Sequence, residues 1–427
     1  MKKKKSSYKA FPVLDHKLIQ LPNGLQVIYK AVPYTQTVHC GYVINAGGRD
    51  DTEQHMGLAH FIEHMVFKGT HKRKTYHILN YLESVGGELN AYTGKEKTCF
   101  YASLPATYLE RGMELLTDIT FHSIFPEKEI GKEQQVVAEE IDMYRGVPDE
   151  AIFEDFDQQV FPGHGLGFPI LGSKTSIQQF KRPQLQQYLQ QHYTQGQVIF
   201  TIIGNVNPTK VERLVEKYLA PQVLPESNLS RFSPPTFSAT QKEASTPGGQ
   251  AHEIIGGRAP ALRTPHYLPF LLLNNLLGGP SMNSRLNLNI RERHGLTYNI
   301  HSFQTSYLDD GIWGVYYACD ERNLKRIRRM VEKELLSLCN RPLGSLRLHQ
   351  VKKQLIGQFT MSHENLLGQA IALAKDLLDF DEIHNFEQQV AGIEAVTAAE
   401  IMEAANIFCH PHNQSRCTYS PTEAGEG

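Results

Sequence analysis

Hydrophobic and polar residues alternate along the first hundred positions in a pattern that predicts β-strands interrupted by two short helices. Asn23-Gly24, which lies between two alternating runs, is a strong signal for a tight hairpin. Farther on, apolar residues recur at helical spacing between Gly57 and Gly69 and again up to Gly86. The expected order is strands at 17–21, 25–29 and 38–44, helices at 57–69 and 76–85, and strands at 88–93 and 98–104.

Helical patterns dominate the next part of the chain. Apolar residues three and four apart predict helices at 105–122, 126–146, 149–161, 176–193 and 208–219. Within this part, the apolar run from Gln197 to Ile203 is typical of a buried strand. Residues 221–249 are rich in Pro, Ser and Thr, which indicates an interdomain linker.

The second half repeats the first in outline. Gly295-Leu-Thr-Tyr-Asn, like Gly87-Glu-Leu-Asn-Ala-Tyr, follows a helix and precedes a strand pair, which suggests a duplicated fold. We therefore predict an α+β protein of two homologous α/β-roll domains, at 17–220 and 250–427, each a largely antiparallel sheet covered by helices. The elements expected after the linker are strands at 250–257, 297–304 and 311–319, and helices at 267–277, 282–293, 322–339, 343–358, 364–379 and 397–408.

Composition excludes several classes of protein. Hydrophobic residues make up 41% and charged residues 21%, which is ordinary for a soluble globular chain. The net charge of -2 shows no excess of basic residues that would bind nucleic acid or an anionic membrane. No apolar run is long enough to span a bilayer. Residues 1–16 carry four lysines directly after Met1 but lack the apolar core of a signal peptide, so we expect a flexible tail, with a transit peptide as the less favoured alternative.

The six cysteines are scattered and form no CxxC pair, which favours reduced thiols and a cytoplasmic location. Cys409-His-Pro-His412, together with Cys417, could bind a metal, but a polar loop is the more common use of such a tail.

The strongest candidate for chemistry is His60-Phe-Ile-Glu-His64. Two histidines four residues apart lie on one face of a helix and can hold one Zn²⁺, and Glu63 lies at the edge of that face, within reach of a metal-bound water. This is the H-x-x-E-H order of the inverzincins. The alternative is a core helix with two hydrogen-bonded histidines. A further helix carries Glu133 and Glu140, two turns apart on one face, although surface helices often carry such acids.

In these motifs the chain resembles the pitrilysin-type (M16) zinc metallopeptidases, in particular the short-chain branch that includes the mitochondrial processing peptidase. Glu140 lies 76 residues after His64, where that family has its third ligand. The resemblance continues through three further segments, which are Gly86 to Thr93, Phe161 to Gly172 and Ser284 to Tyr298. It implies the metalloenzyme LuxS/M16-like fold, a Zn²⁺ ion held by His60, His64 and Glu140, and supporting roles for Glu133 and Glu150.

The resemblance also implies roles for other residues. Glu63 would act as general base on a zinc-bound water, and a peptide would add as an extra strand beside Asn90 and Ala91. Asn90 could equally be a turn residue at a strand end. Arg291 and Tyr298 have the spacing of an Arg/Tyr pair that faces the metal in the family and contacts the substrate. Their alternative is a salt bridge near Glu292 and a tyrosine on a strand surface.

The expected function is that of a zinc-dependent endopeptidase which hydrolyses short or unfolded peptides inside a clamshell dimer. Because one chain carries both the metal motif and the Arg/Tyr pair, we expect a homodimer, with peptides as the other partners and neither nucleic acid nor membrane. The first domain would bind zinc, and the second would lack a metal because its corresponding helix has Leu and Asn at the ligand positions. Two alternatives remain, namely a presequence-processing peptidase and a non-catalytic core-type scaffold subunit.

Overall fold

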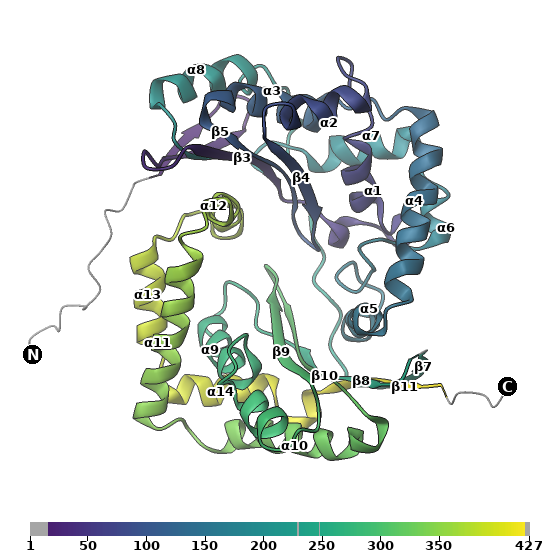
Figure 1. Ribbon diagram of the computed structural model, residues 1–427, viewed down its shortest axis with the longest axis vertical. Coiled ribbons are helices and arrows are strands. Elements are labelled where there is room, and N and C mark those ends of the chain that lie inside the picture. The colour runs from purple at the N-terminus through teal and green to yellow at the C-terminus, as the bar shows by residue number, and fades with distance from the viewer. Residues whose placement is uncertain (1–15, 229, 247, 423–427) are drawn as a thin grey trace, which may run out of the picture.

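In the computed structural model, which describes residues 16–228, 230–246 and 248–422, the first half of the chain forms a six-stranded sheet (Figure 1). The strand order is β1-β2-β6-β3-β5-β4, in which β2 and β6 are parallel and the other neighbours are antiparallel. The strands are β1 (Lys17–Gln20), β2 (Gln26–Ala31), β3 (Thr37–Ile44), β4 (Glu88–Thr93), β5 (Thr98–Pro105) and β6 (Val198–Gly204). The tail predicted at 1–16 lies outside the described residues except for its last position.

The helices of the first half are α1 (Leu58–Met65), α2 (Thr75–Glu83), α3 (Leu109–Phe121), α4 (Glu127–Arg145), α5 (Pro148–Val160), α6 (Lys174–Ile177), α7 (Arg182–His192) and α8 (Pro208–Tyr218). The single helix predicted at 176–193 is wrong. Pro183 lies in the first turn of α7, where no amide hydrogen is needed, whereas inside one continuous helix it would remove a hydrogen bond and clash with the preceding turn, so the chain forms two helices.

The second sheet repeats the topology of the first. Its order is β7-β11-β8-β10-β9, in which the parallel pair β7/β11 corresponds to β2/β6. This confirms the predicted fold class of two related α+β units. The strands are β7 (Gln241–Thr246), β8 (Ala251–Arg258), β9 (Asn299–Ser306), β10 (Gly311–Cys319) and β11 (Ser415–Pro421). β7 lies inside the segment predicted as linker, and β11 contains the buried Cys417, so this cysteine is a core residue.

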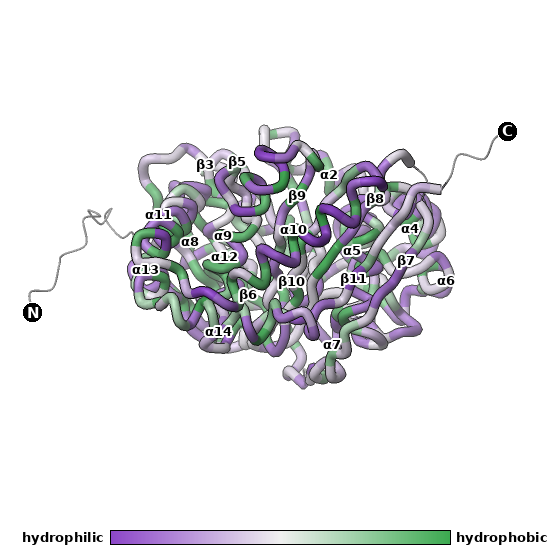
Figure 2. The backbone as a smooth tube through the Cα atoms, turned by 90° about the horizontal axis from the view of Figure 1, so that it is seen from below, coloured by the Kyte–Doolittle hydropathy of each residue, from purple (hydrophilic) through white to green (hydrophobic). Residues whose placement is uncertain are grey.

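The helical elements of the second half are α9 (Tyr267–Gly278), η4 (Asn287–Glu292), α10 (Glu321–Asn340), α11 (Ser345–Ser362), α12 (Leu366–Phe380), α13 (Phe386–Ala395) and α14 (Ala398–Phe408). The helix predicted at 282–293 is present as η4, which is shorter and is a π-helix, and α13 was not predicted. Hydrophilic and hydrophobic positions alternate along α10, as expected of a helix that covers a sheet (Figure 2). No helix in the described part of the chain is long and apolar enough to cross a membrane.

The two halves exchange one helix each. α5, from the first half, packs on β8 and β11, while α12, from the second half, packs on β3 and β6 (Figure 1). Phe156 of α5 is fully buried in one of these contacts, and Ala374 of α12 in the other. β6 is buried along its whole length because it is a central strand with helices against it, which explains its continuous apolar run. Each sheet therefore depends on a helix from the other half for part of its core.

Candidate metal centre

Helix α1 packs its apolar side chains into the core of the first half. Phe61, Ile62 and Met65 are fully buried on one side of the helix. At its beginning, Gly57 adopts a positive φ of 89°, and a Cβ atom there would lie 2.5 Å from the carbonyl oxygen of Leu171. Glycine is therefore required at this position, where the chain enters the helix.

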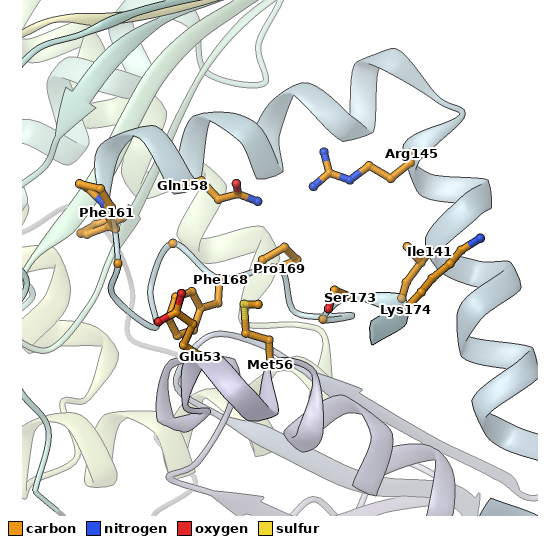
Figure 3. Close-up of a pocket in the computed structure, with 14 residues that line it drawn as sticks. Glu53, Met56, Ile141, Arg145, Gln158, Phe161, Phe168, Pro169, Ser173 and Lys174 are labelled. Atoms are coloured by element: carbon orange, nitrogen blue, oxygen red, sulfur yellow. The ribbon is translucent and has the colours of Figure 1, made fainter. Parts of the chain in front are cut away.

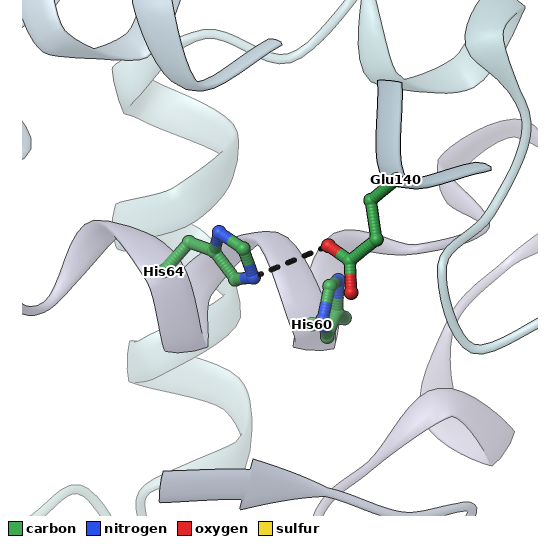
Figure 4. Close-up of side chains that lie close together, drawn as sticks. All are labelled: His60, His64 and Glu140. Carbon is green, nitrogen blue, oxygen red and sulfur yellow. Dashed lines mark ion pairs between the residues drawn. The ribbon is translucent and has the colours of Figure 1, made fainter. Parts of the chain in front are cut away.

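Three side chains from two helices converge beside α1 (Figure 4). His60 and His64 lie on consecutive turns with ring centroids 4.5 Å apart, and Glu140 reaches them from α4. Glu140 Oε2 is 3.7 Å from His64 Nε2, and one ligand atom from each residue lies within 4.8 Å of the others. The predicted ligand set is thus gathered at one point even though 76 positions separate His64 from Glu140.

Glu133 orients the second histidine. His64 Nδ1 donates a 2.9 Å hydrogen bond to Glu133 Oε1, and because a carboxylate only accepts, the proton of the neutral imidazole lies on Nδ1. His64 Nε2 then carries the lone pair that faces Glu140. Lys68 Nζ lies 2.7 Å from the other oxygen of Glu133. Burial raises the pKa of Glu133, but the hydrogen bonds from His64 and Lys68 outweigh burial and bring this pKa below its ordinary value.

The residues fit a zinc ion. His60 Nδ1 is buried and has no hydrogen-bond partner among the described residues. Burial, with the neighbouring His64, lowers the pKa of His60 to about 3, so this imidazole is neutral, which is the form that binds metal. Two imidazole nitrogens and one carboxylate oxygen are the ligands of many catalytic zinc sites, which keep a fourth position open. The hydrogen bond from His64 to Glu133 is the outer contact usual for such a ligand.

Glu63 lies beside the three candidate ligands. Thr93 Oγ1, at the end of β4, donates a 2.6 Å hydrogen bond to Glu63 Oε2. Burial raises the pKa of Glu63, and the Thr93 hydroxyl acts in the opposite direction. A mostly buried carboxylate with a raised pKa is suited to accept and return a proton.

Strand β4 forms an edge of the first sheet, next to α1. Asn90 is exposed, and its side chain accepts a 2.8 Å hydrogen bond from the amide of Ala91. The structure therefore places both residues on an open sheet edge near the histidines.

Arg291 and Tyr298 lie together in the second half of the chain. The Arg291 guanidinium carbon is 5.2 Å from the centre of the Tyr298 ring, and Tyr298 is 84% exposed. Glu150 is exposed in the first turn of α5. Within the part of the chain that the structure describes, none of these three residues is hydrogen-bonded or ion-paired to His60, His64 or Glu140. The residues predicted for the site thus form two groups in one chain. The first group is His60, His64 and Glu140 with Glu63, and the second is Arg291 with Tyr298.

A cavity of about 550 Å³ is separate from these groups (Figure 3). It lies among the end of α4, the end of α5 and the glycine-rich loop after α5. Arg145 and Lys174, which line it, are already paired with Asp155 and Asp142. None of the metal-binding candidates lines this cavity, so it adds nothing to the chemistry of the site.

Sequence reasoning missed two residues that support the site, Thr93 and Lys68. Thr93 ends the segment Gly86 to Thr93 that resembles the family, but no pattern shows that a threonine hydroxyl at a strand end meets a glutamate on a helix. Lys68 lies four residues after His64, which is one turn, although α1 ends before it. That spacing is the one signal that could have suggested a contact near the histidine.

Comparison with known proteins agrees with this geometry. Residues 26–174 match the family described as Insulinase (Peptidase family M16), and residues 179–355 match the Peptidase M16 inactive domain. An uncharacterized zinc protease of Bacillus subtilis strain 168, YmxG, is 31% identical over 343 residues, which is 80% of this chain and 83% of that protein. An uncharacterized zinc protease of Rickettsia felis is 29% identical over 91% of this chain and 93% of its own length.

Solved structures show the same fold. A protease from Helicobacter pylori has a TM-score of 0.87 at 19% identity, with 96% of this chain and all of that chain covered. A peptidase M16 inactive domain from Pseudomonas fluorescens also has a TM-score of 0.87, at 16% identity, with 97% and 100% covered. The family matches, the close relative and the convergence of His60, His64 and Glu140 lead to one conclusion, that this chain belongs to peptidase family M16.

Proposed function

We propose that this protein is a zinc-dependent endopeptidase that hydrolyses short or unfolded peptides. The observation that carries the proposal is the convergence of His60, His64 and Glu140 within 4.8 Å, with Glu63 beside them and held by Thr93. A scaffold subunit has no need for this ligand set or for a half-buried carboxylate next to it. Relatives named as zinc proteases support the same activity.

Each residue has a definite task in this proposal. His60, His64 and Glu140 would hold the ion, which when bound polarises the scissile carbonyl and lowers the pKa of a water molecule. Glu63 takes up a proton at its carboxylate and delivers it to the nitrogen of the leaving amine. Glu133 keeps the proton of His64 on Nδ1, so that Nε2 stays available. Thr93 limits the positions that the Glu63 carboxylate can adopt.

The substrate would bind to the edge of the first sheet. β4 has a neighbour on one side, β5, and its other edge presents backbone N–H and C=O groups. An extended peptide can pair with such an edge, so recognition through Asn90 and Ala91 uses the backbone, which every peptide has. Most backbone groups of a folded protein are already paired with one another, which favours short or unfolded substrates.

The second group of residues suggests a dimer. Arg291 and Tyr298 form a pair, and Tyr298 is largely exposed, so both can meet a molecule outside the chain. We propose that two copies pair as a clamshell, in which Arg291 and Tyr298 of one copy face the metal of the other. The tyrosine hydroxyl could then donate to the oxyanion that develops during hydrolysis.

Replacement of Glu63 tests the proposed activity. Glu63→Gln keeps the size of the side chain but removes its ability to take up a proton, so kcat should fall by about 10²- to 10⁴-fold while bound zinc stays at the parent level. Glu83→Gln, at an exposed position at the end of α2, is the control and should keep full activity on a quenched peptide. If Glu63→Gln cleaves the peptide at the parent rate, the assignment of the base is wrong.

A further inference from the structure

Three consecutive residues before α1 connect the metal helix to distant parts of the chain. They are Arg49, Asp50 and Asp51, in the segment that links β3 to α1. Asp51 is buried and caps α1, because its carboxylate accepts hydrogen bonds from the amides of Gly57 at 2.9 Å and Ala59 at 3.2 Å. A capping carboxylate determines where a helix begins and how its first turn is oriented. His60 follows Ala59 directly, so the position of Asp51 bears on the first metal ligand.

Arg49 is attached to the second half of the chain. Its NH1 and NH2 atoms lie 2.6 Å from the two oxygens of Asp309, in the turn between β9 and β10. Its side chain is only 2% exposed, and NH1 also contacts Glu96 at 2.5 Å. A two-pronged guanidinium–carboxylate contact fixes orientation as well as distance. Glu96 in turn accepts a hydrogen bond from the amide of Leu308, so two contacts tie this turn to the first half.

Asp50 is attached to the segment between the two sheets. Arg231 donates two hydrogen bonds of 2.8 Å to its carboxylate and another to the backbone of Asn45, at the end of β3. Backbone bonds from Gly48 and Arg49 to the loop after β4 hold the same stretch from another side. Residues 49–51 are therefore fixed by side chains from both halves of the chain and cannot shift without moving the beginning of α1.

We propose that Arg49, Asp51 and Asp309 act as positioning residues, through which the half of the chain that supplies no metal ligand sets the geometry of the metal centre. The order of contacts is Asp309 to Arg49, then two residues along the backbone to Asp51, and from Asp51 to the first turn of α1. This inference deepens the proposed function and rests on it for the identity of the ion. It also gives the second half a role in the site that is independent of Arg291 and Tyr298.

Asp309→Asn is the variant that tests this coupling. The asparagine keeps the shape but removes the charge that holds Arg49, and the side chain is 29% exposed, so the protein should still fold. We expect the zinc Kd to rise by about three- to tenfold, less than the 10- to 100-fold typical of a direct partner of a metal ligand. The visible spectrum of the cobalt-substituted protein should change as well, and Asp309→Glu should restore much of the affinity.

The matched control is Asp379→Asn. Asp379 of α12 pairs with Lys97 at 2.6 Å, so it also joins the two halves through a mostly buried ion pair, but it has no contact with residues 49–51. This variant should keep the parent zinc Kd and cobalt spectrum. If both variants weaken zinc binding equally, or if Asp309→Asn binds zinc like the parent, the proposal is overturned.

A metal-free measurement separates this inference from the proposed function. Hydrogen exchange at the amides of Gly57 and Ala59 should be faster in Asp309→Asn than in Asp379→Asn, because only the first variant loosens the cap of α1. This result is expected whether or not the parent hydrolyses peptides. Equal exchange in the two variants would contradict the coupling even if the parent is an active zinc peptidase.

Discussion

The hydroxyl of Thr93 donates a 2.6 Å hydrogen bond to the carboxylate of Glu63, which joins the edge strand β4 to the metal helix α1. In the proposed function the peptide binds along β4 and the base, Glu63, lies on α1. This hydrogen bond therefore joins the element that would bind the substrate to the residue that would take up the proton. Thr93→Val keeps the shape of the side chain but removes the hydroxyl. A hydrogen bond to a charged group contributes about 1.5–3 kcal/mol, so kcat/KM for a quenched peptide should fall about tenfold or more. Thr93→Ser, which keeps the hydroxyl, should stay near the parent value.

Glu133 should control metal affinity without being a ligand. Glu133→Gln leaves a neutral amide next to His64 Nδ1 and Lys68, so the imidazole is held less firmly and is a weaker ligand. We expect the zinc Kd, measured by competition with a chelator, to rise about 10- to 100-fold. Glu129→Gln, on the same helix, removes only an ion pair with Lys132 and should leave the Kd unchanged.

Mixing two inactive variants tests the proposed dimer. Glu63→Gln lacks the proposed base, and Arg291→Ala lacks the residue proposed to face the partner's metal. A mixed dimer would contain one site with both residues intact, so random re-pairing should recover about a quarter of the parent activity, since half of the dimers are mixed and each has one working site of two. If the mixture is no more active than its separate components, Arg291 does not act across a dimer interface.

The helix exchange predicts that a substitution in the first half destabilises the second sheet. Phe156 of α5 is buried against that sheet, so Phe156→Ala should lower the free energy of unfolding by about 3–5 kcal/mol. Trp313, the single tryptophan of the chain, is buried in β10, and its fluorescence during urea unfolding reports on the second sheet. Val136→Ala, at an exposed position on α4, should change stability by less than about 0.5 kcal/mol.

Local pattern was enough to predict many of the elements and to single out the two histidines of α1. The strands around Asn23-Gly24 and helix α1 follow from alternation and helical spacing, which depend on neighbours in sequence. The fold class followed from the repeated order of elements. Glu140 could be selected among the several glutamates of α4 only because its distance from His64 matched a known family.

Contacts between distant segments account for what the sequence did not reveal. The apolar faces of α5 and α12 are visible in the sequence, but nothing there tells which sheet each helix will cover. β7 is polar and largely exposed, so it has the composition of a linker and becomes a strand only by pairing with β11. In the same way, Arg49 and Asp309 are 260 positions apart, and only the folded chain brings them together.

The account depends on a single ion held by His60, His64 and Glu140. The most direct measurement is the zinc content of the purified protein by elemental analysis, compared with Glu140→Gln and with Glu139→Gln, its exposed neighbour on α4. We predict one zinc per chain in the parent and in Glu139→Gln, and loss of most of it in Glu140→Gln together with the activity. A parent protein that retains no zinc, or a Glu140→Gln variant that retains it fully, would contradict the account.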